Sequence, residues 1–155
     1  MNPVHPETYA DVFMHLQNGN LDYVVIGGLA AALHGFLERP VSDLDLAVRP
    51  VPQSAQALMS VLASAGFVAT LPLPIMLVPV MRLFDSRARE IDVLVRSHVP
   101  FEELWQDAKM IHVSGAAVRV ASLAHLIRSK RINGHAEDLE RAEQLETFAK
   151  TRPTN

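Results

Sequence analysis

Two aspartates, Asp43 and Asp45, have the residue type and spacing that most directly indicate chemistry in this chain. The positions next to them, Leu44 and Leu46, are apolar. Because successive side chains of a strand point to opposite faces, a strand at 43–48 would place both carboxylates on one face and the apolar side chains on the other. Two carboxylates on one sheet face favour a bound cation, and magnesium prefers such hard oxygen ligands.

A glycine pair, Gly27 and Gly28, lies about one helix before the aspartates. The pair follows the apolar run 23–26, which is typical of a buried strand, and precedes the helix-forming residues 29–33. It is therefore expected where a strand turns into a helix and where backbone N–H groups have no intrahelical partner. Without a Cβ, the backbone there can approach a phosphate closely, so the pattern indicates a phosphate-sized site.

A third acid, Asp92, lies inside the apolar segment 90–95, which predicts another strand. Taken alone, a glycine pair after a strand is usually a simple turn, and an Asp-x-Asp strand is about as often a solvated face. The combination at this spacing favours a metal–nucleotide site. An unrelated mixed α/β domain with accidental acids is a further alternative.

These residues resemble the nucleotidyltransferase superfamily of the polymerase-beta type, in which a GG or GS turn, a helix, a D-x-D strand and a third acid follow one another. Within it, the chain is similar to the small bacterial toxin-like and antitoxin-like nucleotidyltransferases of the AbiEii kind. The segment 118–145 also resembles the C-terminal helical motif of that group, with Lys130 and Asp138 at its marked positions. The N-terminal motif of the group is matched here by Gly27, Gly28, Ala30, His34, Gly35, Arg39, Asp43, Leu44 and Asp45.

The resemblance implies an enzyme that moves a nucleoside monophosphate from a nucleoside triphosphate to a hydroxyl of RNA, a protein or a small molecule. It implies two Mg²⁺ ions, for which Mn²⁺ can substitute. Asp43 and Asp45 would hold the ion on the nucleotide side, and Asp92 would hold the catalytic ion and assist deprotonation. The implied nucleotide-binding residues are Gly27, Gly28, Arg39, Ser42 and Lys130.

Two segments differ from the pattern of that group. Val41 stands where the group usually has threonine, and the only hydroxyl nearby is on Ser42. His135 and Glu137 stand where a basic pair is usual. The second difference favours an alternative function, a non-catalytic nucleotide-binding or partner-binding module that keeps the fold, such as one half of a toxin–antitoxin pair. The three acids favour the enzyme.

Length and composition set further bounds. The chain has 155 residues, of which 49% are hydrophobic and 20% charged, so one domain over 1–155 is expected, with a core at about 20–120 and C-terminal helices at about 122–150. A net charge of -3 argues against a general nucleic-acid coat, although 119–141 is locally basic enough to face phosphate or RNA. The absence of cysteine is compatible with a reducing cytosol, and no membrane-spanning segment is expected, so a cytoplasmic location is predicted.

The expected fold class is α/β (α+β), a mixed sheet flanked by helices and followed by a C-terminal helical hairpin. Apolar periodicity, glycines and prolines indicate the boundaries of its elements. Helices are expected at 7–18, 28–36, 54–65, 101–109, 122–131 and 136–150. Strands are expected at 23–26, 43–48, 67–70, 75–84, 90–95, 110–113 and 117–120, with 75–84 either one strand or two pieces around Pro79.

Overall fold

The computed structural model describes residues 5–37, 41 and 43–152. Two residues expected in the site, Arg39 and Ser42, therefore lie outside the described residues. The order of elements is η1 (Pro6–Tyr9, a 3₁₀ helix), α1 (Ala10–Gly19), β1 (Tyr23–Ile26), α2 (Gly27–Leu33), β2 (Asp43–Val48), α3 (Pro52–Ser64), β3 (Val68–Ala69), η2 (Ile75–Leu77), β4 (Val80–Phe84), β5 (Glu90–Leu94), α4 (Phe101–Asp107), β6 (Lys109–Val113), β7 (Ala116–Val120), α5 (Leu123–Asn133) and α6 (Ala136–Thr151).

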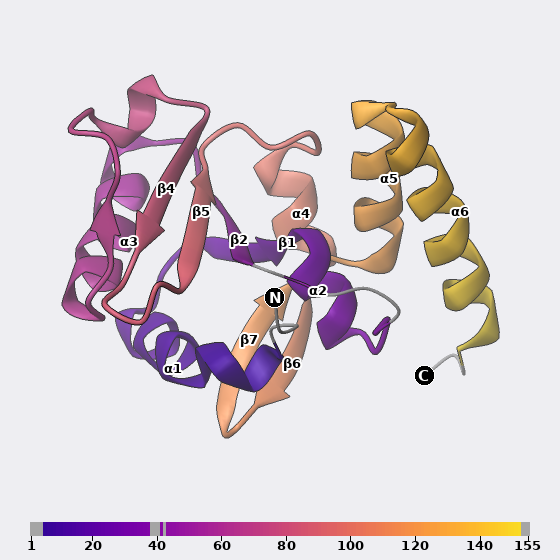
Figure 1. The fold of residues 1–155 in the computed structure, drawn as a ribbon, viewed down its shortest axis with the longest axis horizontal. Coiled ribbons are helices and arrows are strands. Elements are labelled where there is room, and N and C mark those ends of the chain that lie inside the picture. The colour runs from indigo at the N-terminus through magenta and orange to yellow at the C-terminus, as the bar shows by residue number, and fades with distance from the viewer. Residues whose placement is uncertain (1–4, 38–40, 42, 153–155) are drawn as a thin grey trace.

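The strands of the described chain form one seven-stranded sheet in the order β3-β4-β5-β2-β1-β7-β6. The pairs β2/β5 and β1/β7 are parallel and the others are antiparallel, so the sheet is mixed. Helices α5 and α6 lie side by side as a hairpin at the end of the molecule opposite α3 and β4 (Figure 1). The predicted fold class, a mixed sheet flanked by helices with a C-terminal helical hairpin, is confirmed.

The alternation in β2 has the predicted structural effect. Leu44 and Leu46 are fully buried in the hydrophobic core, together with Ile91 and Val93 of the neighbouring strand β5. The aspartates at the positions between them face the opposite side of the sheet, where they are only partly buried. The apolar face of the central strands therefore anchors the acids on a rigid support.

The structure divides the segment 75–84 at Pro79, as the two-piece alternative expects, but the first piece is not a strand. The first piece is the 3₁₀ helix η2, and only Val80–Phe84 forms the strand β4. Pro79 separates the two parts, because a proline has no N–H to donate to a sheet. The neighbouring strand β3 is limited to Val68–Ala69. This edge of the sheet is consequently short.

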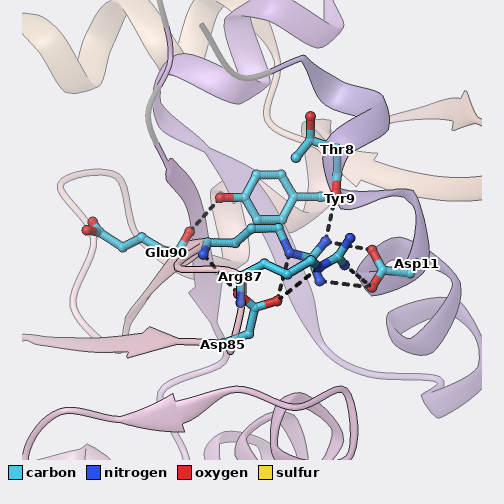
Figure 2. Close-up of polar contacts among 7 residues, drawn as sticks. Thr8, Tyr9, Asp11, Asp85, Arg87 and Glu90 are labelled. Carbon is cyan, nitrogen blue, oxygen red and sulfur yellow. Dashed lines mark hydrogen bonds and ion pairs between the residues drawn. The ribbon is translucent and has the colours of Figure 1, made fainter. Parts of the chain in front are cut away.

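An ion-pair network joins the N-terminal helices to the start of β5 (Figure 2). Arg89 donates hydrogen bonds to Asp85 at 2.8 Å and to Asp11 at 2.8 and 3.0 Å. The Tyr9 hydroxyl donates to the backbone carbonyl of Glu90 at 2.8 Å. These contacts fix the β4–β5 turn against α1, and thereby fix the strand that carries the third acid.

The hairpin docks on the end of α2 through aromatic and polar contacts. The rings of Phe36 and Phe148 meet edge to face with centroids 5.6 Å apart. The His34 Nε2–H donates to the Ala121 carbonyl at 2.8 Å, and its Nδ1 accepts from Arg152 at 3.2 Å. No helix in the described part of the chain combines the length and the apolar character needed to cross a membrane.

Candidate active site

Strand register brings the predicted acids together. Asp45 of β2 lies directly opposite Asp92 of β5, and Asp43 lies opposite Glu90. Because paired residues of parallel neighbours share a face, all four carboxylates are on the same side of the sheet. Ligand oxygens of Asp43, Glu90 and Asp92 lie within 4.8 Å of one another. This spacing suits one or two small divalent cations.

Glu90 is the acid that sequence analysis missed. It stands two residues before Asp92, so the alternation that places Asp43 and Asp45 on one face also places Glu90 with Asp92. The signal was therefore present in the sequence. Only the register Asp43–Glu90, which no local pattern specifies, makes Glu90 a neighbour of the Asp-x-Asp pair.

Asp45 is held in an electrostatically unfavourable position. Burial, the adjacent charge of Asp43 and a hydrogen bond with Asp43 raise the pKa of Asp45 to about 8. Asp45 therefore keeps a proton at neutral pH unless a cation offsets the cluster. A bound divalent cation favours the ionised carboxylate, so it would displace this proton.

The two glycines of the pair have different structural requirements. Gly27 has a φ of +74°, and a Cβ built there would lie 2.3 Å from Oδ2 of Asp45. Gly28 has no such backbone strain, and its Cβ would meet Val41 at an ordinary 3.4 Å. Gly27 is thus the position that requires glycine, because any side chain would displace the second aspartate.

We expect Gly27→Ala to lower the free energy of unfolding by about 2 kcal/mol or more, because it combines a left-handed backbone with a steric clash. Gly28→Ala, its matched control, is expected to change that free energy by less than about 1 kcal/mol, because alanine is the better helix former. Urea unfolding of both variants measures the difference. Equal stability of the two variants would contradict the assignment of strain to Gly27.

A cavity of about 310 Å³ opens beside the acids, between the sheet with α2 and the C-terminal hairpin. On the sheet side it is lined by both glycines and both aspartates of the Asp-x-Asp pair. On the hairpin side it is lined by polar side chains, and apolar residues form the remaining walls. The lining residues include Gly27, Gly28, Asp43, Asp45, Phe36, Val99, Leu104, His98, Ser129 and Lys130.

Lys130 of α5 lines this cavity, as do Gly27 and Gly28. Its Nζ is 3.6 Å from Oδ1 of Asp138. The other carboxylate oxygen of Asp138 accepts a hydrogen bond from the Asn133 side chain. Asp138 therefore orients Lys130. His135 is at the N-cap position of α6, without a side-chain capping hydrogen bond, and Glu137 lies in the first turn of the helix. Neither of them lines the cavity.

Two further cavity residues were missed by sequence analysis. His98 follows β5 and Ser129 lies on α5, and the His98 Nδ1 is 3.2 Å from the Ser129 hydroxyl oxygen. They are 31 residues apart and meet only because the hairpin packs across the end of the sheet. No local sequence pattern reports such a contact.

Comparison with known proteins establishes the fold. No family model matches the sequence, and no curated protein matches it. The lincosamide antibiotic adenylyltransferase LnuA, in its lincomycin-bound crystal structure, superposes with a TM-score of 0.64 and 14% identity, covering 94% of this chain and 98% of that one. The antibiotic-resistance factor ANT(2'')-Ia superposes with a TM-score of 0.63 and 15% identity, covering 92% of this chain and 83% of that one. This chain therefore has the nucleotidyltransferase fold.

Proposed function

We propose that this chain is a metal-dependent nucleotidyltransferase, which moves a nucleoside monophosphate from a nucleoside triphosphate to a hydroxyl acceptor. The observation that carries the proposal is that Asp43 and Asp45 line a ligand-sized cavity while Asp92 stands directly beside Asp45. The carboxylate cluster thus borders the cavity through Asp43 and Asp45. The fold of the chain is consistent with this chemistry.

The carboxylates fit a divalent cation such as Mg²⁺ or Mn²⁺. Their oxygens converge, and the partly buried Asp45 retains a proton that a cation would displace. Asp43 and Asp45 would hold an ion next to the cavity. Asp92 and Glu90, which do not line the cavity, would hold a second ion. Bound there, divalent ions offset phosphate charge and lower the pKa of the acceptor hydroxyl.

The chain's own residues then position the nucleotide. The triphosphate would lie along Gly27 and Gly28, where no side chain intervenes, with the Lys130 ammonium facing it from α5. The base would enter the apolar part of the cavity, which Phe36, Val99 and Leu104 help to line. Arg39 and Ser42 belong to the proposed nucleotide site through the family resemblance alone.

The acceptor is a hydroxyl on RNA, a protein or a small molecule. A small-molecule acceptor is supported by the two similar structures, a lincosamide antibiotic adenylyltransferase and an antibiotic-resistance factor. The resemblance to the AbiEii-like group supports RNA or a protein, and a cognate toxin or antitoxin as partner. A second candidate function, a non-catalytic nucleotide- or partner-binding module, is favoured by His135 and Glu137 replacing the usual basic pair.

The proposal is tested by incubating the purified protein with each α-labelled triphosphate and Mg²⁺ or Mn²⁺, in the presence of total RNA or cell lysate. Labelled RNA, a labelled protein band or a labelled small molecule supports the enzyme and names the acceptor class. Tight nucleotide binding without any labelling supports the binding module instead. A melting temperature that no triphosphate changes, with or without Mg²⁺, counts against both.

Lys130→Gln is expected to weaken triphosphate binding by about tenfold, the effect of losing one charge-assisted contact to phosphate. Arg128→Gln is the matched control, because Arg128 lies on the same helix but pairs with Glu103 and does not line the cavity. Calorimetric titration with a non-hydrolysable triphosphate measures both. Equal losses in the two variants would indicate a general charge effect and remove Lys130 from the site.

A further inference from the structure

The positively charged side chain of Arg82 contacts the part of the acid cluster formed by Asp92 and Glu90. Arg82 of β4 lies opposite Asp92 in the strand register, on the acid-bearing face. Its Nε–H donates to Oδ1 of Asp92 at 3.0 Å, and its Nη2 to Oδ2 at 3.4 Å. The same Nε is 3.3 Å from Oε2 of Glu90. Arg82 therefore engages both oxygens of the third acid and bridges to the fourth.

Arg82 is held by these acids and by little else. Its side chain is 53% exposed, and Asp92 and Glu90 are its hydrogen-bond and ion-pair partners within the described residues. Arg89, one strand away, is only 9% exposed and is fixed by Asp85 and Asp11. The contrast indicates that the Arg82 side chain can leave the acids without unpacking the core, whereas Arg89 cannot.

A divalent cation at Asp92 and the guanidinium at Asp92 compete for the same oxygens. Mg²⁺ binds carboxylate oxygens at about 2.0–2.1 Å, so a metal there would lie close to a group of like charge. An arginine does not relieve that repulsion by losing its proton. Cation binding and the Arg82–Asp92 pair are therefore opposed.

We propose that Arg82 is a built-in competitor for the divalent cation at Asp92, which partly offsets the negative charge of Asp92 and Glu90 in the metal-free protein and withdraws when the cation binds. This inference rests on the proposed function, because it concerns the same carboxylates. It assigns Arg82 a regulatory role: the residue sets the cation concentration at which the second ion site fills. The cost of displacing the guanidinium is subtracted from the affinity of the cation.

The test is a titration of the nucleotide-free protein with Mn²⁺ alone, followed by the electron paramagnetic resonance signal of free Mn²⁺. Arg82→Gln is expected to lower the Kd for Mn²⁺ by about tenfold, because the competing charge is gone. Arg82→Lys keeps a charge but cannot bridge both acids, so an intermediate Kd is expected. Arg87→Gln removes the same formal charge from an exposed pair with Asp11 and is expected to leave the Kd unchanged.

Two additional readouts separate this role from a structural one. The gain of Arg82→Gln is expected to vanish when Asp92→Asn is added, because the cation then lacks its ligand. The metal-free melting temperature of Arg82→Gln is expected to fall below that of the wild type and to recover in Mn²⁺. Should Arg82→Gln not fold, the Kd of Arg82→Lys decides in its place.

The outcomes distinguish the inference from the proposed function. If the wild type binds Mn²⁺ and Arg82→Gln binds it equally or more weakly, the competitor role is overturned while the metal site stands. If neither protein binds Mn²⁺ at millimolar concentrations, both the competitor role and the metal dependence of the proposed function are overturned. A lower Kd in Arg82→Gln and Arg87→Gln alike would reduce the effect to overall charge and also overturn the inference.

Discussion

Asp92→Asn is expected to stop nucleotide transfer while leaving nucleotide binding close to the wild-type value. Asp43 and Asp45 line the cavity in which the nucleotide would lie, whereas Asp92 is next to Asp45 but not among the lining residues. The third carboxylate would therefore serve the acceptor hydroxyl rather than the triphosphate. Loss of a group that acts mainly in the transition state costs on the order of 10²–10³-fold in rate.

The measurement compares label transfer with binding in the same preparation. Transfer from an α-labelled triphosphate is followed with the acceptor mixture described above, and binding is followed by the triphosphate-induced rise in melting temperature. Glu103→Gln is the control, since it removes an exposed carboxylate that pairs with Arg128 outside the acid cluster and the cavity, and it is expected to transfer label at the wild-type rate. A variant Asp92→Asn that transfers label as fast as the wild type would refute the role of Asp92.

Asp45→Asn is expected to stabilise the metal-free protein and to eliminate the Mg²⁺-dependent response to triphosphate. The raised pKa of Asp45 means that its ionised form is disfavoured in the folded protein. An amide of the same shape carries no charge and avoids this penalty. At about 1.4 kcal/mol per pKa unit, and with allowance for solvent screening, the gain at pH 8 is expected to be about 2–4 kcal/mol.

The sign of the pH dependence follows from proton binding. Between the ordinary pKa of 3.8 and its raised folded value, Asp45 binds more protons in the folded than in the unfolded state. The free energy of unfolding therefore falls as pH rises through this window. Urea unfolding in EDTA at pH 5 and pH 8 should show a larger advantage of Asp45→Asn at pH 8. Equal stability of variant and wild type at both values would contradict the burial of an unfavourable charge at this position.

The central part of the site could be predicted from the sequence because local rules determine it. Alternation in a strand separates Asp43 and Asp45 from Leu44 and Leu46, and burial of the leucines then fixes the face of the acids. The mixed sheet and the C-terminal hairpin followed from the order of periodic segments. The strand expected at 75–84 was wrong in its first half, because prolines outweighed apolar character there.

Other parts of the site depend on tertiary contacts that no local pattern encodes. The His98–Ser129 contact exists only because the hairpin docks across the sheet, and the Arg82–Asp92 pair requires the β4–β5 register. Which of Gly27 and Gly28 must be a glycine depends on where the Asp45 carboxylate lies, because a Cβ at that position would clash with it. The assignment of the metal and nucleotide roles themselves stays a prediction.

The position of the hairpin has a consequence for the newly made protein. The carboxylates come from β2 and β5, which lie within residues 43–94, whereas the cavity wall that carries Lys130 comes from α5. Chains are synthesised from the N-terminus, and early segments can begin to fold while later ones are still being made. A nascent chain that has passed β5 contains every residue of the acid cluster, whereas the cavity wall also requires α5, so we expect the cavity to be completed last.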